Sequence, residues 1–242
     1  MADVTLAELI RDCRSRLDET TIGFWSDEEI SRWCWEAARD VARRTEWLQK
    51  TSTQNIVANQ QTYSVPDDLF RVFRVEYVQA SSYSYALEIR NFANMDDLWL
   101  TGRTVAGSQP YACAFWGSPG QRGAGNAATQ QLYLYPTPST SVTNGLVLYY
   151  YGIPAKVGTN DFNAKVEVPS GWDDLVPLYV EVVARRKEAR DSRWREAFEL
   201  YELRLQELIK HTRSITDQQD TMVSGMSGFG ALPAWLVGGD GW

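Results

Sequence analysis

Residues 25–41 carry the sequence WSDEEISRWCWEAARDV, which predicts the start of a long helix. Ser26 and Glu29 stand three residues apart, the spacing of a capping box, in which the two residues pair backbone N–H groups that the first turn leaves free. Trp25 precedes this box and can pack across the first turn. Apolar residues then recur at helical spacing, so we expect a helix over 27–50 with one buried face.

The residues before this helix predict a shorter one of the same kind. Thr5 and Glu8 form a second capping box, and the apolar residues that follow lie along one helical face. Each of these two helices has a single apolar face. Neither is therefore stable alone, and each must bury that face against another element.

The hydrophobic period changes from helical to alternating near residue 52. We predict a hairpin over 53–65 that stops before Pro66, and several further strands. Many short strands separated by Gly, Pro and Ser indicate a small barrel or sandwich. The predicted strands cover 53–57, 62–65, 71–77, 86–89, 112–115, 131–135 and 146–151, with a short helix over 95–100 and a loop over 117–128.

Helical spacing returns after Pro169 and predicts two more helices, joined by Arg-Asp-Ser at 190–192. The four apolar faces can then satisfy one another as a four-helix bundle built from both chain ends. The predicted class is α+β, with the β-barrel or sandwich inserted between the second and third helices. The predicted units are 1–51 for the first helix pair, 52–168 for the β domain, 169–212 for the second helix pair and 213–242 for an extended tail.

The last thirty residues differ from the rest of the chain. Residues 212–224 are polar and cannot pack a core, so we expect them to be mobile in the free protein. Residues 225–242 are rich in glycine but carry large apolar side chains. Such a tail is typical of a segment that orders against a partner. Its candidate docking residues are Phe229, Leu232, Trp235, Leu236 and Trp242.

The composition of the 242-residue chain argues against several functions. It has 24 Lys and Arg residues and 31 Asp and Glu residues, and this net charge of -7 disfavours a sequence-independent grip on nucleic acid. A single histidine, His211, is too few for most histidine-based catalysis or metal binding. Three cysteines without a CxxC pair indicate a reducing compartment. Without a secretory signal or a membrane-spanning apolar stretch, we expect synthesis in the cytoplasm and no membrane partner.

The sequence motifs predict no catalytic residues, no cofactor and no metal, and therefore no enzyme. The glycine-rich segment 117–125 lacks the Gly-Lys-Ser/Thr end and the strand-loop-helix context of a phosphate-binding loop. Three pairs of adjacent carboxylates could suggest acid-base catalysis, but adjacent side chains point in different directions and cannot face each other across a substrate. They lie instead where caps of helices or turns are expected. These pairs are Asp67-Asp68, Asp96-Asp97 and Asp173-Asp174. His211 is predicted near the end of the last helix, where a cation stabilises the helix dipole.

Aromatic and basic residues are the candidates for contacts between subunits. Trp33 and Trp35 stand two positions apart on one helix and cannot both face the core, so an aromatic side chain is left for an interface. Six cations within 185–195 are usually a solvated face. If they have a function, an acidic chain favours contact with another protein subunit over nucleic acid. The inter-subunit candidates are Trp35, Arg185, Arg186, Arg190 and Arg193.

Several segments occur in an order that resembles one protein family. They are Phe24 to Ile30, Tyr63 to Asp68, the strand Phe70 to Tyr77, Leu132 to Pro138, the strand Leu146 to Pro154, and Val168-Pro169 before the closing helix pair. With this order, the chain resembles the head-to-tail adaptor, or connector, proteins of tailed bacteriophages, including the tail tubular protein A type. The resemblance covers most of the chain up to about residue 211.

The resemblance implies a structural virion protein at the head-to-tail interface. It implies a ring of twelve copies beneath the portal that extends the DNA channel and provides the surface to which the tail attaches. The implied partners are the portal protein, a downstream tail, stopper or nozzle protein, and other copies of the chain, with C-terminal segments docking on the portal. DNA would pass without specific binding, which suits an acidic ring that repels the phosphate backbone.

Two other classes of function remain open from the sequence. A carbohydrate-binding module, or another tail or receptor-binding protein, would use Tyr and Trp side chains of the β domain as platforms for sugars. A hydrolase would have to use clustered carboxylates such as Asp96 and Asp97. The helical framework fits neither class especially well.

Overall fold

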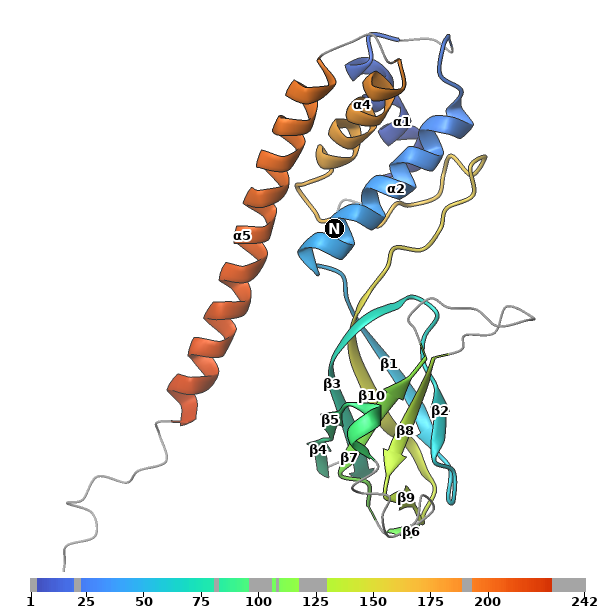
Figure 1. Cartoon of the computed structure of the whole chain (residues 1–242), viewed down its shortest axis with the longest axis vertical. Coiled ribbons are helices and arrows are strands. Elements are labelled where there is room, and N and C mark those ends of the chain that lie inside the picture. The colour runs from blue at the N-terminus through green and yellow to red at the C-terminus, as the bar shows by residue number, and fades with distance from the viewer. Residues whose placement is uncertain are drawn as a thin grey trace, which may run out of the picture.

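The computed structural model describes residues 4–19, 23–80, 83–95, 106–107, 109–117, 130–188 and 193–227, of which 214–227 are described by their backbone. These residues form a helical cluster at one end of the molecule and β-sheets at the other (Figure 1). The helices come from both ends of the chain and the strands from its middle. The predicted α+β class is confirmed.

The described residues contain four α-helices: α1 (Leu6–Arg16), α2 (Asp27–Thr45), α4 (Leu175–Lys187) and α5 (Trp194–Ser227). The first two begin at the predicted caps. The Thr5 hydroxyl accepts a hydrogen bond from the backbone N–H of Glu8, and the Glu8 carboxylate accepts one from the backbone N–H of Thr5. Ser26 accepts from the backbone N–H of Glu29, but the Glu29 carboxylate pairs with Lys187 and returns no bond to Ser26, so the second predicted box is only half formed. At Glu46 the left-handed backbone (φ 53°) ends α2 earlier than predicted.

Helices α1, α2 and α4 share one apolar core. Leu9 of α1, Ile30 of α2 and Val180 of α4 are fully buried in it. A loop closes this core at the start of α1, where the N–H groups of Leu6 and Ala7 donate to carbonyl oxygens in the segment 162–164. These bonds satisfy donors that the first helical turn leaves without intrahelical partners.

The predicted four-helix bundle is wrong, because α4 carries apolar residues on two sides. One side faces α1 and α2, while Leu178 and Val182 on the other side pack with Tyr201 and Leu205 of α5 in a separate core. Helix α5 therefore lies along α4 and the C-terminal part of α2 instead of closing a single bundle core (Figure 1). It also continues to Ser227, well beyond the end at 212 that the polar sequence predicts.

The strands among the described residues form two four-stranded sheets and one two-stranded sheet. The first sheet has the order β1 (Gln49–Ile56), β10 (Val142–Gly152), β3 (Leu69–Ala80), β4 (Tyr83–Ala86). The second has the order β2 (Thr62–Ser64), β8 (Gln131–Tyr135), β7 (Ala112–Trp116), β5 (Glu88–Arg90). The two-stranded sheet pairs β6 (Ala106–Gly107) with β9 (Thr137–Pro138). A short 3-10 helix, η1 (Phe92–Met95), lies where a helix over 95–100 is predicted, but 96–100 fall outside the described residues, as does most of the predicted loop.

The predicted hairpin and the barrel alternative are both wrong. Strand β1 pairs with β10, whereas β2 pairs with β8, so these two consecutive strands lie in different sheets. The turn between them crosses from one sheet to the other: the N–H of Asn59 donates to the carbonyl of Pro138, and the Tyr63 hydroxyl donates back to the carbonyl of Gln60. The two larger sheets keep their edges and enclose one core, in which Val75 of β3 and Leu132 of β8 are fully buried.

A buried arginine fixes the turn between α1 and α2. The Arg14 guanidinium, with its side chain only 8% exposed, lies 2.5 Å from Asp27 Oδ1 and 3.2 Å from Glu19 Oε2. It also donates to the carbonyl oxygen of Trp25 at 3.0 Å. A buried cation is tolerated only when charges and hydrogen bonds compensate its desolvation, and here three partners do so.

Replacing this arginine is expected to destabilise the helical cluster. Arg14→Met keeps the apolar stem but leaves Asp27 and Glu19 without their cation, so the free energy of unfolding should fall by about 2–3 kcal/mol. Urea-induced unfolding measures this change. Arg11→Met, at an exposed position of the same helix, should shift it by no more than about 0.5 kcal/mol. Equal midpoints for the two variants would contradict the structural role of Arg14.

Candidate functional site

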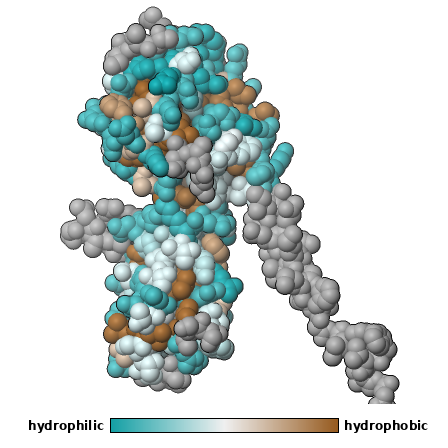
Figure 2. Space-filling view, turned by 180° about the vertical axis from the view of Figure 1, so that it is seen from behind, coloured by the Kyte–Doolittle hydropathy of each residue, from teal (hydrophilic) through white to brown (hydrophobic). Residues whose placement is uncertain are grey.

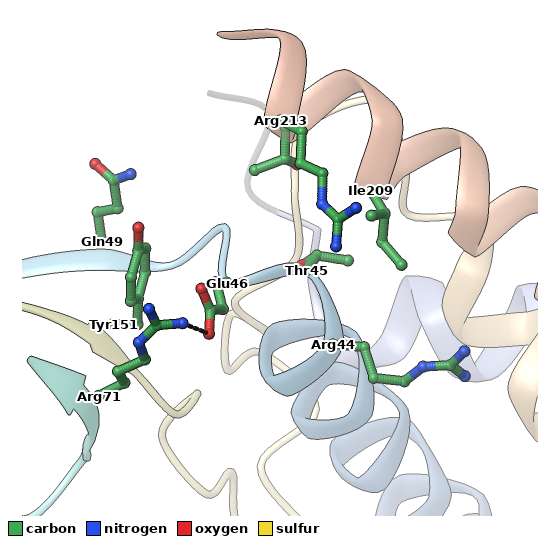
Figure 3. Close-up of a pocket in the computed structure, with 9 residues that line it drawn as sticks. Arg44, Thr45, Glu46, Gln49, Arg71, Tyr151, Ile209 and Arg213 are labelled. Carbon is green, nitrogen blue, oxygen red and sulfur yellow. Dashed lines mark hydrogen bonds and ion pairs between the residues drawn. The ribbon is translucent and has the colours of Figure 1, made fainter. Parts of the chain in front are cut away.

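A pocket of about 320 Å³ lies where the helical cluster meets the first sheet (Figure 3). Its walls come from α2, α5 and the strands β1, β3 and β10. The lining residues are Arg44, Thr45, Glu46, Gln49, Arg71, Tyr151, Ile209, Thr212 and Arg213. Arg71 Nη1 lies 2.7 Å from Glu46 Oε1, which ties β3 to the end of α2. The lining includes neither a histidine nor a cysteine, and its contacts are those of a joint between two parts of the protein.

A second polar network strengthens this joint. Lys50 Nζ lies 3.0 Å from Asp68 Oδ2 and 3.2 Å from Glu167 Oε1, and the Tyr150 hydroxyl donates to Asp68 Oδ1 at 3.0 Å. Burial lowers the pKa of Lys50, but the hydrogen bonds to both carboxylates outweigh it and raise that pKa. Burial and the Asp68 carboxylate raise the pKa of Tyr150, which keeps its proton for this bond. The Asp68 carboxylate therefore serves an ion pair, where the sequence predicts a cap.

Helix α5 is fastened to α2 by two charged contacts. Arg44 donates two parallel hydrogen bonds to the Glu202 carboxylate, at 2.6 and 2.7 Å, and the Tyr201 hydroxyl donates to Asp40 Oδ2 at 2.6 Å. The hydrogen bonds from Arg44 lower the pKa of Glu202. Burial, followed by the hydrogen bond to Asp40, raises the pKa of Tyr201. A bidentate pair of this kind fixes orientation as well as distance.

The other residues weighed as catalytic candidates are two carboxylate pairs and the single histidine. Asp174 occupies the N-cap position of α4, but its carboxylate binds Arg204 at 2.9 Å and makes no cap hydrogen bond. His211 is exposed beside Trp172, and because α5 continues to Ser227 it does not lie near a helix end as predicted. Asp96 and Asp97 lie outside the described residues.

The three cysteines are buried thiols. Cys13 and Cys34 face each other between α1 and α2 with their Sγ atoms 3.8 Å apart, and this contact together with burial raises the pKa of Cys13. Burial also raises the pKa of Cys113 to about 12. Protonated and buried thiols are poor nucleophiles and poor metal ligands.

The predicted inter-subunit residues have mixed surroundings. Trp35 is half-buried, not openly exposed: the guanidinium of Arg39 lies 4.6 Å and the ammonium of Lys156 5.8 Å from its ring centre. Arg185 forms an ion pair with Glu181 at 2.8 Å on its own helix, while Arg186 and Arg193 are exposed. The predicted contact Arg190 and the predicted docking residues Phe229, Leu232, Trp235, Leu236 and Trp242 lie outside the described residues.

The outward side of α2 carries a basic surface that the sequence analysis does not single out. Arg32, Arg39 and Arg43 recur at intervals of seven and four residues, which places them on one helical face away from the core. Within the described part of the chain, none of the three forms an ion pair with a carboxylate; Arg39 stacks on Trp35 and Arg43 lies over Phe70. We call Arg32, Trp35, Arg39 and Arg43, with the neighbouring Lys156, the arginine face. Noting the spacing of the arginines outside the apolar stripe would have revealed it.

The outward side of α5 combines exposed leucines with carboxylates. Leu200 and Leu203 are 48% and 59% exposed, large fractions for leucine on a helix that also has a buried face. Glu196 and Glu199 lie beside them, both exposed. We call these four residues the acidic leucine face. Figure 2 shows hydrophobic side chains at the surface of the helical cluster on the side where α5 runs. Exposed apolar groups rimmed by polar ones mark interaction surfaces.

A third surface lies on the β-sheets. Trp116 is 55% exposed, and its ring centre is 4.6 Å from that of Phe92, which in turn lies 5.1 Å from that of Tyr133. An aromatic cluster of this kind can stack on a ligand or on another protein.

The described residues contain neither a metal-binding cluster nor a membrane-spanning helix. Among them, no three His, Cys, Asp or Glu side chains gather closely enough to hold a metal ion. No described helix has the length and apolar character needed to cross a membrane.

The comparison with known families covers nearly all of this structure. The model of a family described as SU10 adaptor protein matches residues 4–226, from the start of α1 to the end of α5. The chain belongs to the SU10 adaptor protein family. It is thus a structural protein of the bacteriophage particle, as the sequence predicts, although the match is not specifically to the tail tubular protein A type. A search of curated proteins found no match.

The contact between Arg44 and Glu202 makes the docking of α5 sensitive to acid. Because the pKa of Glu202 is lower in the folded chain than its ordinary 4.5, the unfolded chain binds more protons near that pH. The stabilisation is complete above that value and is lost as the pH falls through the folded pKa. The stability difference between wild type and Glu202→Gln should therefore be largest at about pH 7 and shrink steadily as the pH falls below 4.5.

Urea unfolding at a series of pH values measures this difference. Glu196→Gln, at an exposed position on the same helix, is the matched control and should show no such pH dependence. A Glu202→Gln difference that stays constant across the acid range would show that the carboxylate charge does not hold α5.

Proposed function

We propose that the protein is a head-to-tail adaptor, twelve copies of which form a ring beneath the portal. The ring extends the DNA channel from the head and provides the surface to which the tail attaches. The observation that carries this proposal is the match to the SU10 adaptor protein family over residues 4–226. It spans the helical cluster, both larger sheets and α5, so it concerns the whole architecture and not one shared motif.

The elongated shape supports such a role. The helical cluster and the sheets lie at opposite ends of the molecule, joined by residues 46–48 and by the segment after β10 (Figure 1). A ring built from such subunits presents one kind of surface to the head side and another to the tail side. The partners in this account are the portal protein and a downstream tail, stopper or nozzle protein.

The charge of the chain supports passage of DNA without a firm grip. A net charge of -7 repeated twelve times around a channel repels phosphates on the whole. The proposal also gives the protein no catalytic role. It is supported by the structural use of Asp68, Asp174 and the buried thiols, whose contacts occupy the groups that catalysis would need.

One observation favours a second candidate function, the binding of carbohydrate by the sheets. The exposed Trp116 and the half-buried Phe92 and Tyr133 form an aromatic cluster of the kind on which sugar rings stack. Binding of the full chain to a glycan array, lost on Trp116→Ala, would support a receptor-binding role.

The ring proposal predicts the outcome of mixing the purified chain with the portal protein of the same phage. Alone, the chain should sediment as a monomer or a weak oligomer; with portal it should co-sediment and appear as closed rings by electron microscopy. Unchanged sedimentation together with an absence of rings would refute the adaptor role.

The C-terminal residues are proposed to dock on the portal. Deleting 225–242 should weaken binding to portal by about tenfold or more, since it removes the apolar anchors around Trp235, each of which can contribute about 1–3 kcal/mol when buried. Titration of fluorescently labelled portal measures the affinity. Equal affinities of the truncated and complete chains would remove the tail from the interface while leaving the ring proposal intact.

A further inference from the structure

We propose that neighbouring copies in the ring join head to tail through two described surfaces: the acidic leucine face of α5 in one copy seats on the arginine face of α2 in the next. This inference rests on the proposed ring function and assigns the residues that hold the ring together. It replaces the cations at 185–195, which the sequence favours, by a different set on α2.

The arginine face has the exposure and the charge needed to bind an anionic protein surface. Arg32 and Arg43 are exposed, and no carboxylate in the described part of the chain pairs with them, with Arg39 or with Lys156. Several other arginines of the helical cluster do have such partners, as Arg14, Arg16, Arg44 and Arg204 show. Two carboxylates lie on the same side of α2: the exposed Glu28, one turn before Arg32, and the half-buried Glu36, between Arg32 and Arg39. The surface thus keeps a net positive charge in an acidic protein.

The acidic leucine face has the complementary character. Leu203 points away from the side of α5 that buries Tyr201 and Leu205, so it cannot be covered by α2 or α4 of its own chain. Glu196 and Glu199, which flank the leucines, have no cationic partner among the described residues. Arg193 and Arg195 are exposed within one turn of Glu196 at the start of this stripe, and Lys210 is exposed two turns beyond Leu203. Exposed leucines beside two carboxylates that have no ion-pair partner match a partner surface that offers apolar groups and cations.

The two faces lie on different sides of the helical cluster, as a ring contact requires. Helix α5 runs along one side, while Lys156 over Trp35 shows that the arginine face is turned toward the segment after β10, on the other side of α2 (Figure 1). A contact between two different surfaces of the same chain is heterologous. Such contacts generate rings, whereas a self-complementary surface generates a pair.

A second copy explains the two faces better than DNA does. DNA phosphates could neutralise the arginines, but they would leave Leu200 and Leu203 in water. Docking of α5 on α2 covers the leucines against Trp35 and the arginine stems and pairs both sets of charges. A contact of this modest size is weak for an isolated pair, and binding of several copies to one portal raises the effective concentration at which neighbours meet.

Charge reversal of each face, alone and together, tests the contact in the full chain. Glu196→Arg with Glu199→Arg, or Arg32→Glu with Arg43→Glu, should reduce closed rings on portal by about tenfold or more. The chain with all four substitutions should form rings again, because each copy then carries two reversed faces that match. The control is Arg11→Glu with Arg74→Glu, which changes the net charge as the arginine-face variant does but at exposed positions elsewhere.

Electron microscopy counts the rings, and co-sedimentation reports separately whether single copies still bind portal. Circular dichroism checks folding, and Glu→Gln with Arg→Ala versions provide milder variants if a reversal unfolds the chain. Loss in both single-face variants with recovery in the combined chain supports the contact.

Three other results would overturn the inference. Rings in every variant would refute the contact and leave the adaptor role standing. Loss in the arginine variant alone, with reduced salt-dependent DNA binding and no recovery in the combined chain, would assign the arginine face to DNA. Failure of the unaltered chain to form rings with portal would refute the proposed function itself.

Discussion

The bidentate contact of Arg44 with Glu202, supported by the hydrogen bond from Tyr201 to Asp40, sets the position of α5. Helix α5 is by far the longest helix described, with 34 residues, and its first half, from Ala197 to Ile209, packs in the apolar core that it shares with α4. Its direction therefore depends on how that half is seated. Two parallel hydrogen bonds to one carboxylate resist rotation of the helix about its axis, which a purely apolar contact would resist less strongly. The rotation of α5 about its axis in turn determines which of its residues face away from α2 and α4.

Helix α5 can take this position because α4 is apolar on two sides. One core joins it to α1 and α2, and the other joins it to α5, so the helices form two adjacent layers of contact. The outer sides of α2 and α5 both remain uncovered by the described chain. In the proposed ring, neighbouring copies would cover these leucines and pair with these arginines.

The sequence predicted local features well and long-range partners less well. The capping boxes at Thr5 and Ser26 and the alternating residues of β3 are local patterns. The structure contains the complete box at Thr5, the side-chain cap at Ser26 and the strand. The pairing of β1 with β10 depends on residues about ninety positions apart and is not visible in local spacing. For the same reason, local spacing does not show that α4 packs against different helices on its two apolar sides, and it therefore predicts a single four-helix bundle.

The same difference between local features and long-range partners applies to the candidate surfaces. That Trp33 and Trp35 cannot share one core was predictable from their spacing, but the half-burial of Trp35 depends on Lys156, which belongs to another part of the chain. The unpaired state of Arg32, Arg39 and Arg43 likewise emerges only when every nearby carboxylate has been placed. Leu203 looked like part of the apolar content of the last helix until the neighbours of α5 were known.

The most direct test of the account is a covalent link between neighbours across the proposed contact. Leu203→Cys and Arg32→Cys in the same chain place one thiol on each face, and the three native cysteines are buried and should not compete. Oxidation on assembled portal rings, followed by non-reducing electrophoresis, should give a ladder of linked multimers that reaches the size of the closed ring. Either single substitution should give dimers at most. Rings that form on portal but yield only monomers from the doubly substituted chain would contradict the account.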